Sequence, residues 1–232
     1  MKGTIQVPSR DVSPAHSREK RQRIGANLSP AQGHGHLPAM LVAMPRLFFA
    51  LQPHPAQRRT MHEAAAPLLR ELGGRAVLAD DLHLTLCFIG EVEGAPLDAL
   101  LTAAGRIAAP VIDLRLHRLD YWPDSRVLCL LPESRAGVET VVALAARLSA
   151  AVRAAGFAAD STRFRPHITV GRLMPSPATP ARTWPQPLAD SLPLTAEAFV
   201  LMGSKATTTG PRYAVHHSWR ASVQAGHPHA DS

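Results

Sequence analysis

The chain has 232 residues, of which 46% are hydrophobic and 19% are charged. This composition provides enough apolar side chains for a hydrophobic core and excludes a wholly disordered or fibrous protein. No segment reaches the roughly 20 consecutive apolar residues that a membrane-spanning helix needs, and the first residues lack the apolar run of a signal peptide. We therefore expect a soluble protein that is cytoplasmic and has no membrane partner.

The formal net charge of +7 suits an anionic partner. Residues 1–43 hold six Lys or Arg and two acidic residues, a net charge of +4, so the rest of the chain carries only +3. A mildly basic remainder is compatible with a phosphate-bearing substrate and does not require a long nucleic-acid groove.

The pattern along the chain changes at residue 44. Residues 1–43 are rich in Ser, Pro, Gly and charged side chains and show no strand or helix period, which is typical of disorder. We expect a disordered basic extension there, with Met40 or Met44 as a candidate for the true start. One folded domain is expected over residues 44–222, followed by a tail at 223–232.

The apolar spacing and the Gly and Pro positions predict the elements of this domain. Six prolines between Pro175 and Pro193 predict a surface loop. In chain order we expect a strand at 44–52, a helix at 57–72, a strand at 82–89, a helix at 96–108, strands at 112–117 and 127–131, a helix at 136–155, an extended segment at 163–172, and strands at 197–202 and 212–220.

A duplicated tetrapeptide carries the functional argument. His83-Leu-Thr-Leu86 and His167-Ile-Thr-Val170 both read His-x-Thr-x with an apolar residue at each x. Residues i and i+2 of a strand point to the same face, so each strand presents an imidazole beside a hydroxyl. A single such tetrapeptide is common on a half-exposed strand, whereas two copies in two predicted strands favour a paired functional site.

Two such strands that face one another would surround a cleft with two imidazoles and two hydroxyls. A neutral imidazole can take a proton from water and a protonated one can give a proton to a leaving oxygen, because the ordinary histidine pKa is about 6.5. Threonine hydroxyls can bind the non-bridging oxygens of a phosphate. This set of groups suits in-line displacement at phosphorus without a metal ion.

The segment from Pro45 to Ala221 resembles the 2H phosphoesterases, and within them the RNA 2',3'-cyclic phosphodiesterases, also called 2'-5' RNA ligase-like proteins. The resemblance implies a bilobal α+β fold with two antiparallel sheets and flanking helices around a central groove. It rests on four segments of the sequence: Arg46-Leu-Phe-Phe-Ala50, Asp81-Leu-His-Leu-Thr-Leu-Cys-Phe-Ile-Gly90, Phe164-Arg-Pro-His-Ile-Thr-Val-Gly-Arg172 and Gly210-Pro-Arg-Tyr213.

The resemblance also implies roles for individual residues. It makes His83 the proton donor to the leaving 3'-oxygen and His167 the proton acceptor that activates water. Thr85 and Thr169 become ligands of the phosphate oxygens, and Arg172 becomes a substrate-binding residue. Strict strand alternation turns Arg172 away from His167, so this last role requires the strand to end or twist at Gly171.

The reaction that the resemblance implies opens a terminal RNA 2',3'-cyclic phosphate to a 2'-phosphomonoester, and members of the family also join tRNA halves through a 2'-5' linkage in vitro. The expected partner is an RNA with a 2',3'-cyclic phosphate end, such as a tRNA fragment, and the expected state is a monomer. Two alternatives stay open: a non-catalytic RNA- or nucleotide-binding module, and a 2H phosphodiesterase for another small cyclic phosphate.

Four further side chains are weaker candidates. Arg165 shares the face of His167 and is either a rim charge or a group that attracts phosphate. Phe48 or Phe49 is a candidate for stacking on a nucleobase, with a core position as the alternative for each. Cys87 continues the face of His83 and Thr85, so we expect it at the groove floor.

We expect no metal and no cofactor. The two cysteines, Cys87 and Cys129, lie in apolar runs that indicate buried side chains, and a zinc site needs about four ligands. The other histidines that we considered have no acidic or cysteine partners at a suitable spacing; they are His34, His36, His216, His217, His227 and His229.

Overall fold

The structure is a computed structural model, which describes residues 46–92, 97–132, 137–159, 164–172, 183–205, 207–208 and 211–221. The chain divides into two units, Met1–Met40 and Leu41–Ser232. The expected extension at 1–43, including its candidate start sites, and the expected tail at 223–232 lie outside the described residues.

The second unit alternates strands and helices. In chain order, the elements are β1 (Arg46–Leu51), α1 (Pro55–Leu72), β2 (Arg75–Ala76), the 3-10 helix η1 (Ala79–Asp81), β3 (Leu84–Glu91), α2 (Leu97–Gly105), β4 (Ile112–Trp122), β5 (Val127–Pro132), α3 (Val138–Ala154), β6 (Ile168–Arg172), β7 (Gln186–Ala196), β8 (Ala198–Lys205) and β9 (Arg212–Arg220).

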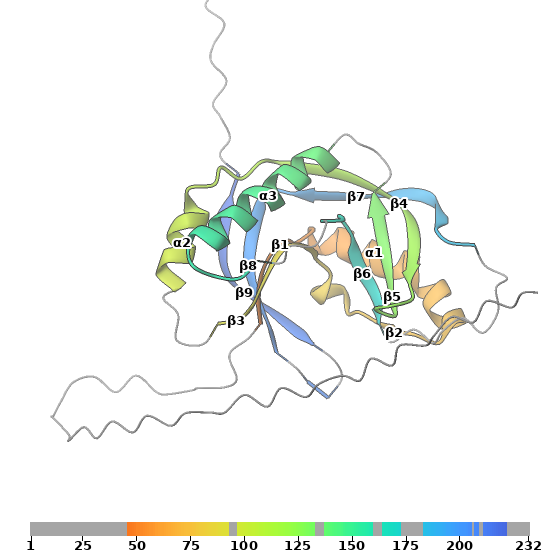
Figure 1. Cartoon of the computed structure of the whole chain (residues 1–232). Coiled ribbons are helices and arrows are strands. Elements are labelled where there is room, and N and C mark those ends of the chain that lie inside the picture. Colours follow the sequence, from red (N-terminus) through yellow and green to blue (C-terminus); the bar gives the residue numbers. More distant parts are fainter. Residues whose placement is uncertain are drawn as a thin grey trace, which may run out of the picture. The chain divides into compact units, whose positions relative to one another are not determined.

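The strands form two antiparallel sheets, which are both visible in Figure 1. One has four strands in the order β3-β1-β8-β9, and the other has five in the order β2-β6-β5-β4-β7. β3 and β6, which follow the two duplicated histidines, belong to different sheets. The expected bilobal α+β fold with one motif in each sheet is therefore confirmed.

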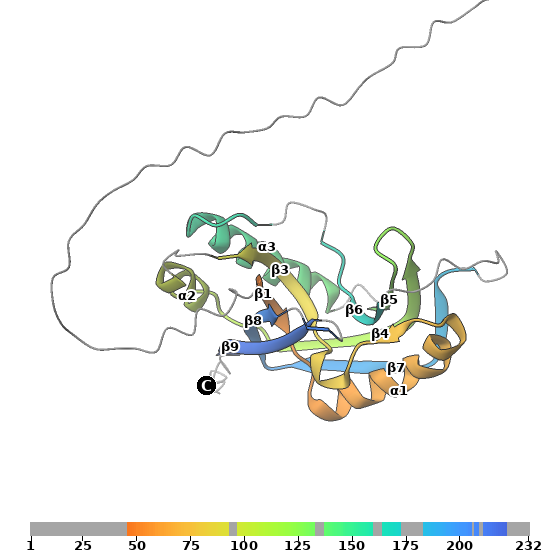
Figure 2. The ribbon, with the colours of Figure 1, turned by 90° about the horizontal axis from the view of Figure 1, so that it is seen from below.

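The helices pack across the boundary between the two sheets. α1 follows β1 of the four-stranded sheet but packs against β2, β6 and β7 of the five-stranded sheet, whereas α3 packs against α2, β3 and β4. Figure 2 shows α1 beside β7 and α3 beside β3. The shared core contains fully buried Phe49, Phe199, Leu128 and Leu130, so both sheets bury one face in the same apolar cluster. Within the described residues, no helix is long and apolar enough to cross a membrane.

Each sheet has a smaller apolar cluster on its other face, which we call the site face. On the four-stranded sheet the cluster contains Phe48, Ala50, Val200 and Met202, with Tyr213 packed against it. On the five-stranded sheet it contains Val127, Cys129 and Leu131, with Trp122 packed against it. Residues directly opposite one another in antiparallel strands project to the same side, and Thr85 is opposite Ala50 while Thr169 is opposite Cys129. Both threonines therefore stand on site faces.

The three predicted helices are present, with shifted ends. α1 begins two residues earlier than expected, because Pro55 occupies its first turn and His54 and Gln57 form a capping box. α2 ends at Gly105, three residues before the expected end. The strand β2 and the short helix η1 were not predicted, because two or three residues are too few for a periodic pattern.

The predicted loop from Pro175 to Pro193 is wrong over its second half. β7 begins at Gln186 and includes Pro187 and Pro193, which lie opposite Arg118 and Arg115 of β4. β7 is an edge strand, and an edge tolerates proline because one side of the strand has no hydrogen-bonding neighbour. Residues 175–182 of the predicted loop lie outside the described residues.

Candidate active site

His83 lies between η1 and β3, one residue before the strand that was predicted to contain it. Its Nδ1 lies 2.7 Å from the backbone carbonyl oxygen of Asp81. Since a carbonyl only accepts hydrogen bonds, Nδ1 carries the hydrogen and the neutral ring has its lone pair on Nε2. Phe48 and Tyr213 flank the ring, with centroids 4.9 and 4.6 Å away.

His167 repeats this arrangement in the other sheet. It precedes β6 by one residue, and its Nδ1 lies 2.7 Å from the carbonyl oxygen of Arg165, again two residues earlier. The ring packs against Trp122, with centroids 4.5 Å apart. Both imidazoles are thus fixed in the same tautomer by the backbone, and Nε2 of each is the nitrogen available for proton transfer.

A β-bulge follows each threonine of the duplicated motif. In β3, Ala50 pairs with Thr85 and Phe49 pairs with Cys87, so Leu86 is an extra residue. In β6, Cys129 pairs with Thr169 and Leu128 pairs with Gly171, so Val170 is an extra residue. A bulge interrupts strand alternation, so residues beyond it change face relative to the His-x-Thr pair.

The bulge at Leu86 corrects the prediction for Cys87. Cys87 lies opposite Phe49 and belongs to the shared core, so it does not line the site face as expected. The other cysteine takes that position: Cys129 lies beneath Thr169, with Sγ and Oγ1 3.9 Å apart. Burial raises the pKa of the Cys129 thiol to about 12, so this thiol is protonated near neutral pH.

The bulge at Val170 gives Arg172 its position. The predicted requirement was a strand end or twist at Gly171, and the structure instead has an extra residue directly before that glycine. Arg172 Nη2 donates to the Tyr213 hydroxyl across the two sheets, at 3.2 Å. The positive charge of Arg172 lowers the pKa of both His83 and His167, and its partner Tyr213 packs its ring against that of His83.

Burial is the first cause of the altered proton affinity of both histidines. It lowers the pKa of His83 to about 4, with further lowering by Arg172 and by His167, while the bond to the Asp81 carbonyl acts in the opposite direction. Burial also lowers the pKa of His167, with the Arg165 carbonyl raising it and the charges of Arg165 and Arg172 lowering it further. In the free protein, both imidazoles are therefore neutral at pH 7.

Arg165 belongs to a cluster beside His167. Its guanidinium carbon lies 4.6 Å from the centre of the Trp122 ring, and Nη2 lies 3.9 Å from the Asp120 carboxylate. Trp122 Nε1 donates to the same carboxylate at 2.9 Å. Since the Arg165 side chain is 59% exposed, this cluster supports the rim-charge alternative and gives His167 a fixed aromatic neighbour.

The two phenylalanines of β1 point to opposite faces. Phe49 packs against Phe199 and Trp219 in the core, whereas Phe48 packs against His83 and Tyr213 on the site face. Phe48 is only 3% exposed and packs against the His83 ring, so it has no free ring face for a nucleobase. Phe88, opposite Phe48 in β3, is 42% exposed.

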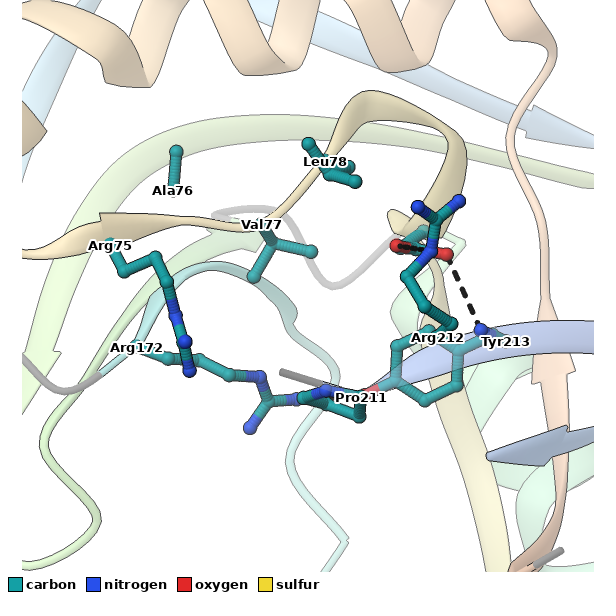
Figure 3. Close-up of a pocket in the computed structure, with 9 residues that line it drawn as sticks. Arg75, Ala76, Val77, Leu78, Arg172, Pro211, Arg212 and Tyr213 are labelled. Carbon is teal, nitrogen blue, oxygen red and sulfur yellow. Dashed lines mark hydrogen bonds and ion pairs between the residues drawn. The ribbon is translucent and has the colours of Figure 1, made fainter. Parts of the chain in front are cut away.

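Asp81 connects the first motif to β9. Its buried carboxylate accepts from the backbone N–H of Tyr213 at 3.4 Å and forms an ion pair with Arg212 at 3.0 Å. Figure 3 shows these contacts as dashed lines at Arg212 and Tyr213. The same residue therefore supplies the carbonyl that orients His83 and the carboxylate that holds β9 beside it.

Sequence reasoning did not assign functions to Trp122, Tyr213 or Asp81. Asp81 and Tyr213 lie in segments that carry the family resemblance, and this was the one available signal. For Trp122 the sequence held no such signal, because its contact with His167 joins residues 45 positions apart. Among the described residues, no three His, Cys, Asp or Glu side chains form a group that could hold a metal ion.

Comparison with known proteins is consistent with this geometry. A profile described as the 2'-5' RNA ligase superfamily matches residues 52–207. The RNA 2',3'-cyclic phosphodiesterase of Escherichia coli is 38% identical over 128 residues, which are 55% of this chain and 71% of that protein. Its counterpart in Thermus thermophilus is 32% identical over 187 residues, which are 73% and 87% of the two chains. The crystal structure of E. coli LigT with 3'-AMP matches with a TM-score of 0.66 at 31% identity, over 76% of this chain and 98% of that one.

Proposed function

This chain belongs to the 2'-5' RNA ligase superfamily of 2H phosphoesterases, and from that membership we propose that it hydrolyses the 2',3'-cyclic phosphate at an RNA end to a 2'-phosphomonoester without a metal ion. The relatives named RNA 2',3'-cyclic phosphodiesterase support the substrate class. The observation that carries the proposal is the matched pair of histidines, each fixed through Nδ1 to a carbonyl two residues earlier.

In the proposed mechanism, water attacks phosphorus on the side opposite the 3'-oxygen. Nε2 of His167 takes the proton from this water as the new P–O bond forms. The bond from phosphorus to the 3'-oxygen breaks, and Nε2 of His83 delivers a proton to that oxygen, which leaves a 3'-hydroxyl and a 2'-phosphate. A general acid or base of this kind contributes about 10²- to 10⁴-fold to the rate.

Polar groups at the site support binding of the cyclic phosphate. The hydroxyls of Thr85 and Thr169 stand on the two site faces and can donate to the non-bridging oxygens. The anion also favours protonation of a buried imidazole beside it, so substrate binding raises the pKa of His83 from its low value in the free protein. Attack by the 5'-hydroxyl of another RNA in place of water would produce a 2'-5' linkage, so ligation belongs to the same proposal.

The test is an oligoribonucleotide with a 2',3'-cyclic phosphate end, incubated with the purified protein in excess EDTA. We expect conversion to the 2'-phosphate, resolved from the 3'-phosphate by chromatography. His83→Ala and His167→Ala should each lower kcat by at least about 10²-fold, the lower range for loss of a general acid or base.

His216→Ala is the matched control, because His216 is an exposed histidine on β9 and lies outside both His-x-Thr motifs. This variant should keep the activity of the parent. Conversion that disappears in EDTA would remove the metal-free mechanism. Binding of the RNA by folded protein without turnover would support the non-catalytic alternative, and turnover of a cyclic mononucleotide alone would support the alternative substrate.

A further inference from the structure

A pocket of about 210 Å³ has Tyr213, the ring neighbour of His83, in its lining. It lies where β2 and β6 of the five-stranded sheet approach the start of β9 (Figure 3). Neither histidine lines it; its lining includes Arg75, Val77, Leu78, Arg172, Arg212 and Tyr213. It is smaller than the roughly 300–1,000 Å³ typical of a site for a whole small molecule, so its size suits one group of a longer ligand.

The pocket carries an excess of positive charge. The ion pair with Asp81 neutralises Arg212. Within the described residues, the guanidinium of Arg75 forms no ion pair, and Arg172 hydrogen-bonds through Nη2 to the neutral hydroxyl of Tyr213. Two of the three arginines are therefore without a negative partner in this part of the chain.

A donor in the pocket also lacks an acceptor. Nε of Arg172 is buried and makes no hydrogen bond in the structure. A buried donor without an acceptor is unfavourable, and guanidinium groups bind phosphate oxygens through two parallel N–H donors. An anion with several acceptor oxygens would neutralise the charges of Arg75 and Arg172 and would accept a hydrogen bond from Nε of Arg172.

The pocket is continuous with the site of the proposed reaction. Tyr213 lines the pocket and packs its ring edge against His83, with centroids 4.6 Å apart. Arg172 lines the pocket and acts electrostatically on both histidines. Tyr213 and Arg172 therefore connect the pocket to the site of the proposed reaction, so an RNA chain whose cyclic phosphate lies at the histidines can extend into the pocket.

We propose that this pocket binds the phosphodiester on the 5' side of the cyclic phosphate, through the guanidinium groups of Arg75 and Arg172. The inference rests on the proposed function and adds to it a preference for oligonucleotides over mononucleotides. Arg75 is then a specificity-determining residue that contacts the substrate at a distance from the reacting phosphorus.

The experiment compares the dinucleotide ApA and the mononucleotide adenosine, each with a 2',3'-cyclic phosphate, as substrates for the full-length protein and for Arg75→Gln. We expect Arg75→Gln to raise KM for the dinucleotide by about 5-fold, the scale of one solvent-accessible charge contact. We expect its kcat to stay unchanged, and its KM for the mononucleotide to stay within about 2-fold of the parent value on the same scale. The slope of log KM against log salt should fall by about 0.7, the value for one phosphate contact on a single strand.

A dinucleotide with an uncharged methylphosphonate linkage identifies the source of the anion. The parent protein should lose affinity for this analogue to the level of Arg75→Gln, and Arg75→Gln should treat both dinucleotides alike. If Arg75→Gln weakens the methylphosphonate analogue as much as the natural dinucleotide, the pocket does not bind that linkage, and the proposal is wrong.

Arg147→Gln is the matched control, because Arg147 is an exposed arginine on α3 and does not line the pocket. It should leave all of these constants unchanged. Equal effects of Arg75→Gln on the mononucleotide and the dinucleotide would overturn the proposed subsite while leaving the hydrolytic function intact. Absence of turnover by the parent protein on either substrate would instead contradict the function on which the subsite rests.

Discussion

At the scale of single residues, the two histidines share one tether and differ in their surroundings. Each donates Nδ1–H to the carbonyl oxygen two residues earlier. His83 is enclosed by Phe48 and Tyr213, whereas His167 has Trp122 on one side and the charge of Arg165 nearby. Paired titratable groups in different environments acquire different proton affinities, which an acid and a base require.

These environments predict the pH dependence of the reaction. The pKa of His83 is lowered to about 4 and that of His167 is also lowered. His83, the proposed acid, must be protonated, so its active fraction rises as the pH falls. His167, the proposed base, must be neutral, so its active fraction decreases as the pH falls through its pKa. Since kcat/KM reports the free enzyme, its maximum should lie below about pH 6.5, the ordinary histidine value.

The measurement is kcat/KM from pH 4 to 9 for a dinucleotide with a 2',3'-cyclic phosphate end. Arg165→Gln supplies the comparison, because it removes a positive charge that lowers the pKa of His167 and should move the maximum to higher pH. A maximum above pH 7.5 in the parent protein would show that the two imidazoles do not titrate in the free enzyme as their surroundings indicate.

At the scale of elements, the bulges explain what the sequence pattern predicted and what it did not. Both motif strands were recognisable from apolar alternation, and the cooperation of His83 with His167 in one site stays a prediction. The bulges were not predictable, because Leu86-Cys87 remains an apolar pair whichever residue is the extra one. Alternation therefore placed Cys87 on the wrong face and left Arg172 without a route to the site.

Gly137, the residue before α3, leaves no room for a side chain. It precedes α3 with φ of 77°, and a Cβ there would lie 2.4 Å from the backbone oxygen of Asp113 in β4. Gly156, beyond the other end of α3, has φ of 85° but no heavy atom within 4 Å of a Cβ. Gly137→Ala therefore combines backbone strain with a collision, whereas Gly156→Ala has the strain alone.

We expect Gly156→Ala to lower the free energy of unfolding by about 1 kcal/mol, which is the cost of the left-handed backbone conformation for a residue with a Cβ. Gly137→Ala should lower it by at least about 2 kcal/mol more, since main-chain atoms of β4 must move. Thermal unfolding of both variants measures the difference, which corresponds to several degrees in Tm for a domain of this size. Equal Tm values of the two variants would mean that the backbone of β4 moves to accommodate the added methyl group at little cost.

At the scale of the whole molecule, the relation between the sheets was the least predictable feature. The repeated tetrapeptide indicated that two strands cooperate, and the family resemblance indicated a bilobal fold. The hydrogen bond from Arg172 to Tyr213 and the ring contact of Trp122 with His167 join segments about 40 residues apart. Local periodicity carries no information about such contacts. The first depends on how the two sheets pack, and the second depends on the strand order within the five-stranded sheet.

The composition of residues 1–43 and the extent of the family match predict that this segment is dispensable for folding and turnover. It is rich in Ser, Pro, Gly and charged side chains, and the family profile matches residues 52–207. A chain that begins at Met44 should therefore keep the Tm of the full-length protein and its kcat/KM for a dinucleotide with a 2',3'-cyclic phosphate end. Calorimetry and kinetics of both chains provide the check, and a lower Tm of the shorter chain would assign a structural role to the extension.

The prolines of β7 also have a consequence for solubility. Strands at the edge of a sheet can recruit strands of other molecules, which leads to aggregation. In the five-stranded sheet, one edge is β2, which has two residues, and the other is β7, where Pro187 and Pro193 have no N–H to donate. Neither edge offers a long, regular row of donors and acceptors to an approaching chain, so this sheet resists growth by addition of foreign strands.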